Sequence, residues 1–202
     1  MKIYDISQEV FSSRGFPGDP SPERRVLCDM DRGDLYNLTA FSMCAHNGTH
    51  VDAPYHFIYE GKRVDEISLS ATVGWAYVAE FDGTLTAEDA RGMLARAASL
   101  HPEAAYRILI KGDAVVSEQA AEVFAGFGVL LVGNESQTVG PENAPLSVHK
   151  ILLGADAVLL EGIRLKDVDE GVYLLSAPPL ALGGADGAPV RAILIDMNAE
   201  SF

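Results

Sequence analysis

One stretch of twelve residues, 46–57, holds the side chains best suited to chemistry. It contains His46, His50 and His56, three of the chain's five histidines, together with Asp52. Imidazole and carboxylate groups are ligands that suit zinc, manganese or iron. A lone histidine is most often a solvated or structural residue. Three of them with an aspartate in so short a stretch favour a metal or catalytic site.

The backbone of this stretch is predicted to be a rigid turn and not a helix. Gly48 permits conformations that other residues avoid, and Pro54 fixes φ and removes a hydrogen-bond donor. A helical pair of ligands at His46 and His50 is disfavoured, because Gly48 separates them and Pro54 follows closely. The β-like run over residues 35–43 leads directly into the turn. We therefore expect the site at the end of a strand.

The remaining elements indicate an α/β protein. Apolar patterns predict strands over residues 2–7, 24–27, 35–43, 73–81, 106–110, 129–132, 157–162, 173–177 and 192–195. Helices are predicted over 86–98, 117–124 and 147–153, with Thr86, Ser117 and Ser147 as their N-caps. The continuous apolar run at 129–132 is typical of a strand covered on both faces. Glycine and proline predict a loop over residues 14–22.

Two further features bear on the site. Glu161 ends an aliphatic strand, where a carboxylate is costly unless it is paired, binds a metal or emerges into water at Gly162. The loop Gly183–Arg191 is rich in glycine but matches neither common phosphate-binding pattern, so close packing near the site is the better interpretation. Phe16, in the first loop, is either a core plug or a pocket residue.

Composition narrows the classes of function. A chain of 202 residues is predicted to form one domain, 1–202, and its net charge of −14 argues against nucleic acid or an anionic membrane as partner. Cys28 and Cys44 make no disulfide framework or paired-cysteine metal site, and Cys44 is expected as an apolar filler in a buried strand. No signal sequence or membrane-spanning run is apparent, so we expect a cytoplasmic protein.

The motif His46-x-Gly48-Thr49-His50-x-Asp52-x-Pro54-x-His56-Phe57 resembles the signature of the metal-dependent cyclase family. That family includes bacterial kynurenine formamidase (arylformamidase) and isatin hydrolase. Other segments are similar to the family's opening and closing elements: Tyr4–Ser7, Phe16–Asp19, Ser147-x-His149, Glu161-Gly162 and Leu180–Arg191. The resemblance therefore covers most of the chain.

The resemblance implies a fold and a site. The fold would be a compact swivelling β/β/α domain with a mixed, barrel-like sheet and few helices. Two divalent ions would be bound, zinc in the first place and manganese as the alternative. By position, the first ion would be held by His46, His50 and Asp52, and the second by Asp52, His149 and Glu161. His56 would be the catalytic acid/base, and Phe16, Tyr55 and Phe57 would contact the substrate.

The implied activity is hydrolysis of a C–N amide bond by metal-activated water, most simply on an N-formyl aromatic amine such as N-formylkynurenine. Opening of a cyclic amide and a non-catalytic metal-binding role are the alternatives. Two departures from the formamidases bear on the substrate: Phe16 stands where those enzymes typically carry tryptophan, and residues 134–138 differ from their usual sequence. A homodimer or homotetramer is expected from the resemblance.

Overall fold

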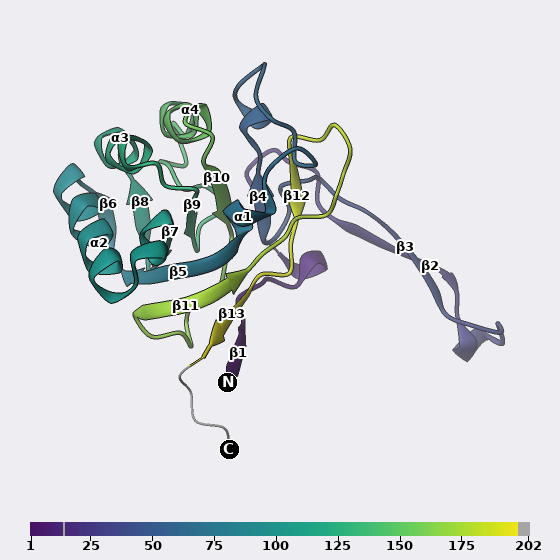
Figure 1. Ribbon diagram of the computed structural model, residues 1–202. Helices are drawn as coiled ribbons and strands as arrows, with labels where there is room; N and C mark the ends of the chain where they lie inside the picture. The colour runs from purple at the N-terminus through teal and green to yellow at the C-terminus, as the bar shows by residue number, and fades with distance from the viewer. Residues whose placement is uncertain (14, 198–202) are drawn as a thin grey trace.

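The computed structural model describes residues 1–13 and 15–197, which form a curled nine-stranded sheet with helices on one face and a long projecting ribbon (Figure 1). The order across the sheet is β1-β13-β11-β5-β7-β9-β10-β4-β12. These strands are Lys2–Asp5 (β1), His50–Asp52 (β4), Val73–Glu80 (β5), Arg107–Lys111 (β7), Leu131–Asn134 (β9), Val158–Glu161 (β10), Gly171–Ser176 (β11), Gly187–Pro189 (β12) and Ile193–Asp196 (β13). The mixed α/β class and barrel-like sheet predicted from the sequence are confirmed.

The centre of the sheet is parallel and its flanks are antiparallel. Strands β5, β7, β9 and β10 pair in parallel, and every other pairing in this sheet is antiparallel. Three helices cover the outer face of the parallel part: Ala87–Leu100 (α2), Glu118–Phe127 (α3) and Leu146–Gly154 (α4). A single-turn helix, Leu69–Thr72 (α1), precedes β5, and Gly83–Leu85 (β6) pairs with Ala114–Val116 (β8) in a separate parallel pair.

Side-chain alternation divides the core into two apolar clusters, one on each face of the sheet. In β7, Ile108 and Ile110 pack with the helices, while Leu109 lies in the second cluster, inside the curl. Phe124 of α3 is fully buried in the first cluster. Because both faces are covered, the central strands are continuous apolar runs, as the sequence predicted.

The helix boundaries follow their capping residues. Thr86 and Asp89 form a capping box at the start of α2, and Ser117 caps α3 through a hydrogen bond from the Ala120 N–H. The prediction that Ser147 caps the third helix is wrong. That helix begins at Leu146 with Pro145 at the N-cap, because the fixed φ of proline already suits a helix start and places Ser147 inside the first turn.

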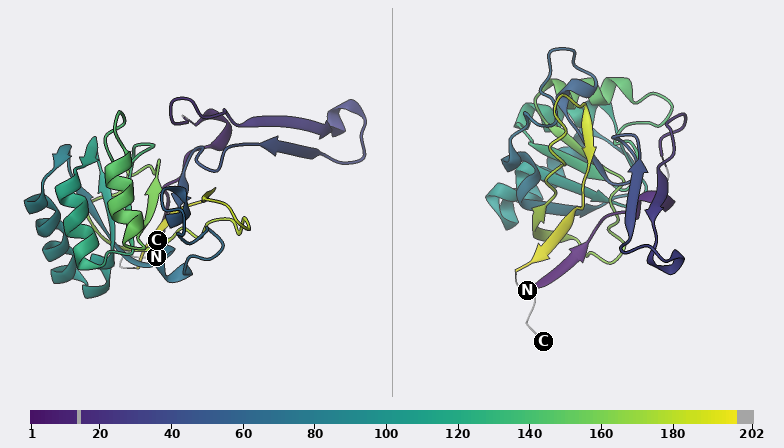
Figure 2. Two further views of the ribbon diagram at one scale, coloured as in Figure 1. Left: turned by 90° about the horizontal axis from the view of Figure 1, so that it is seen from above. Right: turned by 90° about the vertical axis from the view of Figure 1, so that its right-hand side faces the viewer.

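The ribbon is the feature least like a compact domain. Strands Glu23–Cys28 (β2) and Leu38–Ser42 (β3) pair with each other alone and project from the body, with a short 3₁₀ helix, Met30–Arg32, near the tip (Figure 2). We call residues 23–42 the arm. Most of its residues are exposed on both faces. Both strands were predicted from the sequence, but their projection was not.

The structure also bears on the predictions for Cys44 and for the first loop. Cys44 lies half-buried in the turn between β3 and β4, so its placement in a buried strand is wrong; β3 ends at Ser42 because the chain must leave the arm there. Arg14, part of the predicted first loop, lies outside the described residues. Within residues 1–13 and 15–197, no helix has the length and apolarity needed to cross a bilayer.

Candidate metal centre

A three-residue strand, β4, positions the first half of the site. It lies between β10 and β12, with His50 opposite Glu161 and Val51 opposite Leu160. Because side chains alternate along a strand, Val51 enters the core while His50 and Asp52 share the other face. The preceding turn supplies His46, and the 3₁₀ helix Pro54–His56 supplies the last histidine. The stretch is not helical at His46–His50, as predicted, but it is not a single turn at the end of strand 35–43: β3 ends at Ser42 in the arm, and His50 and Asp52 lie in a strand of their own, β4.

The second half of the site comes from α4 and the end of β10. His149 Nε2 lies 3.2 Å from Glu161 Oε1 and 3.6 Å from Asp52 Oδ2. His50 Nε2 lies 3.3 Å from Asp52 Oδ1 and 3.5 Å from Glu161 Oε2. The side chains of these four residues are at most 4% exposed. Residues about a hundred positions apart in the chain thus converge on one buried spot.

The convergent atoms fit divalent metal ions. Two groups of donor atoms, each within 4.8 Å of one another, share Asp52: one with His46 and His50, the other with His149 and Glu161. Ligands around a tetrahedral zinc ion, at bonds of about 2.0–2.1 Å, lie roughly 3.3 Å apart, close to the separations found here. Imidazole with carboxylate suits zinc or manganese. The two groups are the ligand sets that the resemblance implied.

Outer hydrogen bonds fix the orientation of the ligand histidines. His50 Nδ1 donates to the Gly48 carbonyl at 3.1 Å, and His149 Nδ1 donates to the Pro145 carbonyl at 2.8 Å. Each bond leaves Nε2 as the lone-pair nitrogen facing the cluster, the tautomer that a metal ligand requires. Glu161 Oε1 accepts the Val139 N–H at 2.8 Å, which fixes the carboxylate as well.

Asp186 is a site residue that the sequence reasoning missed. Its Oδ2 accepts hydrogen bonds from His46 Nε2 at 2.9 Å and from His56 Nδ1 at 3.0 Å. It lies in the glycine loop 183–191, whose close packing near the site was predicted and is confirmed. A Cβ on Gly187 would stand 2.8 Å from His46 Cε1. The pattern pointed to this loop but not to its carboxylate.

The charges of the cluster are strongly coupled. Burial opposes protonation of His46, but its hydrogen bonds to Asp186 and Asp52 outweigh this and raise its pKa to about 11. Burial likewise opposes protonation of His50, whose bonds to Asp52 and Glu161 raise its pKa to about 9. Hydrogen bonds from His46 and His56 hold the pKa of Asp186 far below its usual value. Without metal, imidazolium groups therefore neutralise the buried carboxylates.

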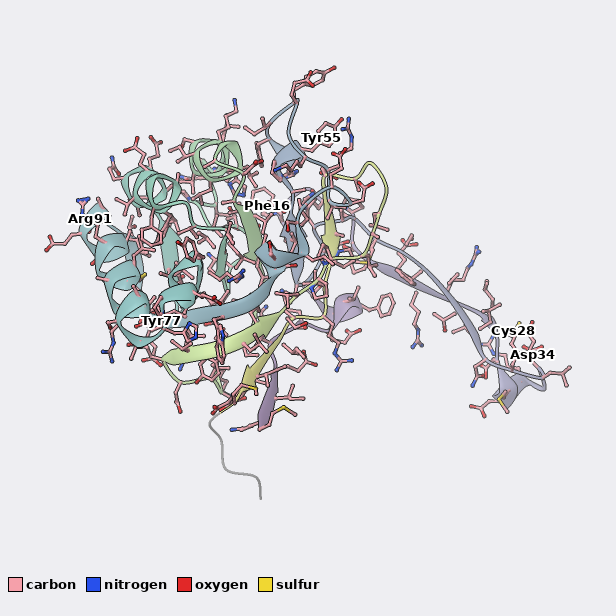
Figure 3. All side chains as sticks on the ribbon, viewed as in Figure 1. Phe16, Cys28, Asp34, Tyr55, Tyr77 and Arg91 are labelled. Atoms are coloured by element: carbon pink, nitrogen blue, oxygen red, sulfur yellow. The ribbon has the colours of Figure 1, made fainter. Side chains whose placement is uncertain are left out.

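A cavity of about 220 Å³ opens over the cluster. Phe16 and Phe57, both predicted to contact substrate, are half-buried in its wall, and the imidazole of His56 lies at its edge with 26% of the side chain exposed. Tyr55 does not line this cavity. Its ring lies instead against the guanidinium of Arg63, 4.5 Å from ring centroid to carbon, in the upper part of Figure 3.

Comparison with known proteins shows the family of the chain. The family model Cyclase matches residues 4–140. The chain belongs to the Cyclase family. It is 33% identical to the kynurenine formamidase of Salinibacter ruber, over 97% of this chain and 98% of the relative. It is 31% identical to the kynurenine formamidase of Bacillus cytotoxicus, over 94% of this chain and 95% of the relative.

Solved structures of the same fold cover nearly the whole chain. One, described as a potential metal-dependent hydrolase with cyclase activity, is 26% identical, covers 98% of this chain and 99% of its own, and has a TM-score of 0.79. Isatin hydrolase A from Labrenzia aggregata has a TM-score of 0.81 at 21% identity, over 96% of this chain and 93% of its own. The curled sheet is thus the fold of the family.

Proposed function

We propose that the chain is a metal-dependent amidohydrolase that removes the formyl group from an N-formyl aromatic amine, N-formylkynurenine being the first substrate to test. One observation carries this proposal. The buried cluster supplies two ligand groups that share Asp52, while His56 stands beside it with a carboxylate partner of its own. The relatives named kynurenine formamidase support the choice of substrate.

The ligand groups would hold two divalent ions, zinc in the first place and manganese as the alternative. His46, His50 and Asp52 would bind one, and Asp52, His149 and Glu161 the other. The chemistry that such ions supply is polarisation of the amide carbonyl and a water pKa lowered toward neutrality.

His56 is suited to move the proton. Because its Nδ1 donates to Asp186, its Nε2 carries the lone pair in the neutral ring and lies 4.0 Å from Asp52 Oδ2. That nitrogen would accept the proton of the attacking water and return it to the departing amine nitrogen, leaving formate and an aromatic amine. The rings of Phe16 and Phe57 offer apolar surface to the aryl group.

The decisive experiment combines metal analysis with a substrate screen. Protein loaded with zinc or manganese is assayed on N-formyl aromatic amines and on cyclic amides. We expect His56→Ala to lose turnover but keep its metal, and His50→Ala to lose both. His101→Ala is the matched control, because His101 stacks on Trp75 and does not line the cavity.

Each outcome of that experiment bears on the proposal. Turnover confined to cyclic amides would indicate that the same residues catalyse ring opening instead of deformylation. Metal binding without any turnover would indicate a binding protein on this scaffold. Loss of metal from His56→Ala would contradict its assignment as acid/base. Wild-type protein that takes up no divalent ion and is unaffected by chelation would overturn the proposal as a whole.

The assembly is proposed on different grounds. We propose a single catalytic domain that forms a homodimer or homotetramer in the cytoplasm, with the arm as the oligomer contact. The arm carries large apolar side chains that stay largely exposed in the single chain, from Val26 at 39% exposed to Leu35 at 93%, although the ring of Phe41 meets Phe11 edge-to-face outside the arm. Two-stranded ribbons are marginally stable alone in water. If each of two copies packed its arm against the other, the apolar side chains of both arms would be covered.

A further inference from the structure

A second cavity adjoins the one over the metal cluster. It has a volume of about 630 Å³ and lies between the N-terminal loop and the loop after β9. The two cavities share Phe16, Gln137 and Thr138, so one wall belongs to both. We call the second cavity the annex. A ligand whose ring lies against Phe16 can therefore extend from one cavity into the other.

Three ionisable side chains line the annex: Arg164, Glu135 and Glu142. Arg164 Nη1 donates to the carbonyls of Glu135 at 2.9 Å and Ile163 at 2.7 Å, which orients the guanidinium without neutralising it. Among the described residues, Arg164 makes no ion pair within 4.0 Å, and it is the one lysine or arginine that lines either cavity. The chain as a whole carries a net charge of −14. Both oxygens of Glu135 accept backbone N–H groups, from Gly112 and Leu165 at 2.9 Å each, and Glu142 is exposed, so the unpaired guanidinium is the group in the annex that can receive an anion.

The position of this charge relative to the cluster is set by the backbone. Arg164 follows the ligand Glu161 by three residues, so their α-carbons lie at most about 11 Å apart. The Arg164 N–H donates to the Ile6 carbonyl at 2.8 Å, which fixes this segment against the residue that follows β1. Because the two cavities share the wall at Phe16, an aromatic ring held there can direct a short side chain into the annex. A carboxylate at the end of that side chain would meet the guanidinium.

We propose that the annex binds a carboxylate-bearing side chain on the substrate's aromatic ring, with Arg164 as its counter-ion. The inference rests on the proposed function and adds a specificity-determining residue to it. Guanidinium groups match carboxylates through parallel N–H···O bonds, and the remaining N–H groups of Arg164 are available for them. Such a contact lies away from the scissile bond, so it acts on binding and leaves the chemical step unchanged.

Three substrates and two variants test this proposal. The substrates are a 2-formamidophenyl ketone whose side chain ends in a carboxylate, its methyl ester, and formanilide. For Arg164→Gln we expect KM for the acid to rise about 10-fold or more at unchanged kcat, with no change for the ester or formanilide. Arg91→Gln is the matched control, because Arg91 is exposed on α2 at the far side of the molecule (Figure 3).

The possible failures are distinguishable. Equal kcat/KM for acid and ester in the wild-type protein overturns the inference, even if Arg164→Gln proves unstable. So does an equal loss with all three substrates. If no formamide is hydrolysed, the proposed function fails, and calorimetric binding of the deformylated acid still tests the annex. Binding that Arg164→Gln leaves unchanged would count against it, whereas weaker binding that Arg164→Lys partly restores would support it.

Discussion

At the scale of single residues, Asp186 has two partners with different roles. One is His46, a proposed metal ligand, and the other is His56, the proposed acid/base. A carboxylate that accepts from the outer nitrogen of a ligand histidine fixes its tautomer and ring orientation. The same carboxylate does this for His56, so a single side chain sets the direction of both rings. The distance between ligand and acid/base is thereby fixed as well.

Replacing Asp186 by asparagine should separate positioning from metal binding. We expect kcat to fall by about 10- to 100-fold, as for other outer partners of metal-site histidines, because His56 loses the acceptor that fixes its Nε2 lone pair. KM should change little, and metal content at saturating zinc should persist because all five proposed ligands remain. Steady-state kinetics with metal analysis on the same sample provides the measurement.

Asp65→Asn is the control for that variant. Asp65 Oδ1 accepts the Gly184 N–H at 3.0 Å, so it supports the same loop without contacting either histidine. An amide oxygen can still accept this bond, and near wild-type kinetics are expected. If Asp186→Asn retained full kcat, or if both variants lost activity equally, the positioning role of Asp186 would be refuted.

The site was predictable where its residues are close in sequence. The spacing of His46, His50 and Asp52 in one turn indicated a metal centre, and the cost of a carboxylate after aliphatic residues drew attention to Glu161. His149 was assigned only through the family resemblance, because a single histidine on a short helix carries no signal. Asp186 follows Asp52 by 134 residues (186 − 52). Its role depends on how the loop folds back, which no local pattern encodes.

At the scale of elements, two glycine turns join the halves of the site. Gly162 ends β10 with φ of 68°, and Gly48 precedes β4 with φ of 69°. A Cβ on Gly162 would stand 2.6 Å from the Gly48 carbonyl oxygen and would also meet the amide groups of Gln8 and Gln137. The Gly162 carbonyl accepts from Thr49 Oγ1 and from Gln8 Nε2, both at 2.8 Å. Close backbone approach here positions Glu161 opposite His50.

Gly162→Ala should therefore damage both stability and metal binding. Positive φ disfavours alanine, and the added methyl group would push against backbone and the half-buried amides of Gln8 and Gln137. We expect a loss of at least about 1–3 kcal/mol in the free energy of unfolding, together with weaker zinc binding. Chemical denaturation and zinc titration measure the two effects.

Gly126→Ala is the comparison for that substitution. Gly126 lies inside α3, and a Cβ there meets nothing within 4 Å. Alanine favours a helix interior over glycine by about 0.5–1 kcal/mol, so this variant should be as stable as wild type or more so. A Gly162→Ala protein of wild-type stability would show that the two turns can accommodate a methyl group despite their close packing.

The elements themselves were largely predictable, but the arm was not. Apolar patterns found both strands of the arm because β-forming residues are frequent in them. Those patterns do not show whether an apolar face packs on its own chain or projects from it. Leu35 and Phe41 belong to the β-like run predicted over residues 35–43, yet they are 93% and 60% exposed. Whether an apolar face is covered depends on what other segments or other copies of the chain pack against it, and the strand's own sequence does not encode this.

At the scale of the whole molecule, the buried cluster makes stability depend on pH when metal is absent. The pKa values of His46 and His50 rise from an ordinary 6.5 to about 11 and about 9 in the folded protein. A group with a raised folded pKa adds stability below its unfolded pKa and loses that contribution as pH rises through the folded value. The free energy of unfolding of the metal-free protein should therefore fall as pH rises from about 6.5 through 9 and above.

We expect the midpoint of thermal unfolding of chelator-treated protein to fall between pH 6.5 and pH 9.5. Zinc-loaded protein should not show this fall, because its ligand histidines are already deprotonated. Calorimetry of both forms in matched buffers makes the comparison. A metal-free protein whose midpoint stays level or rises over this range would contradict the charge state inferred for the cluster.

The last prediction concerns the assembly of the protein through the arm. Leu35 and Phe41 belong to an apolar surface that isolated monomers would expose to water, and burying each side chain in a partner should strengthen association about 10-fold or more. We therefore expect wild-type protein to have at least twice the 21.6 kDa mass of the chain, and Leu35→Ser with Phe41→Ser to shift it toward the monomer. Tyr59→Ser is the control, because Tyr59 is 84% exposed but lies outside the arm. Sedimentation at several concentrations would decide the matter, since a monomeric wild-type protein, or a double variant of unchanged mass, would exclude the arm as the contact between copies.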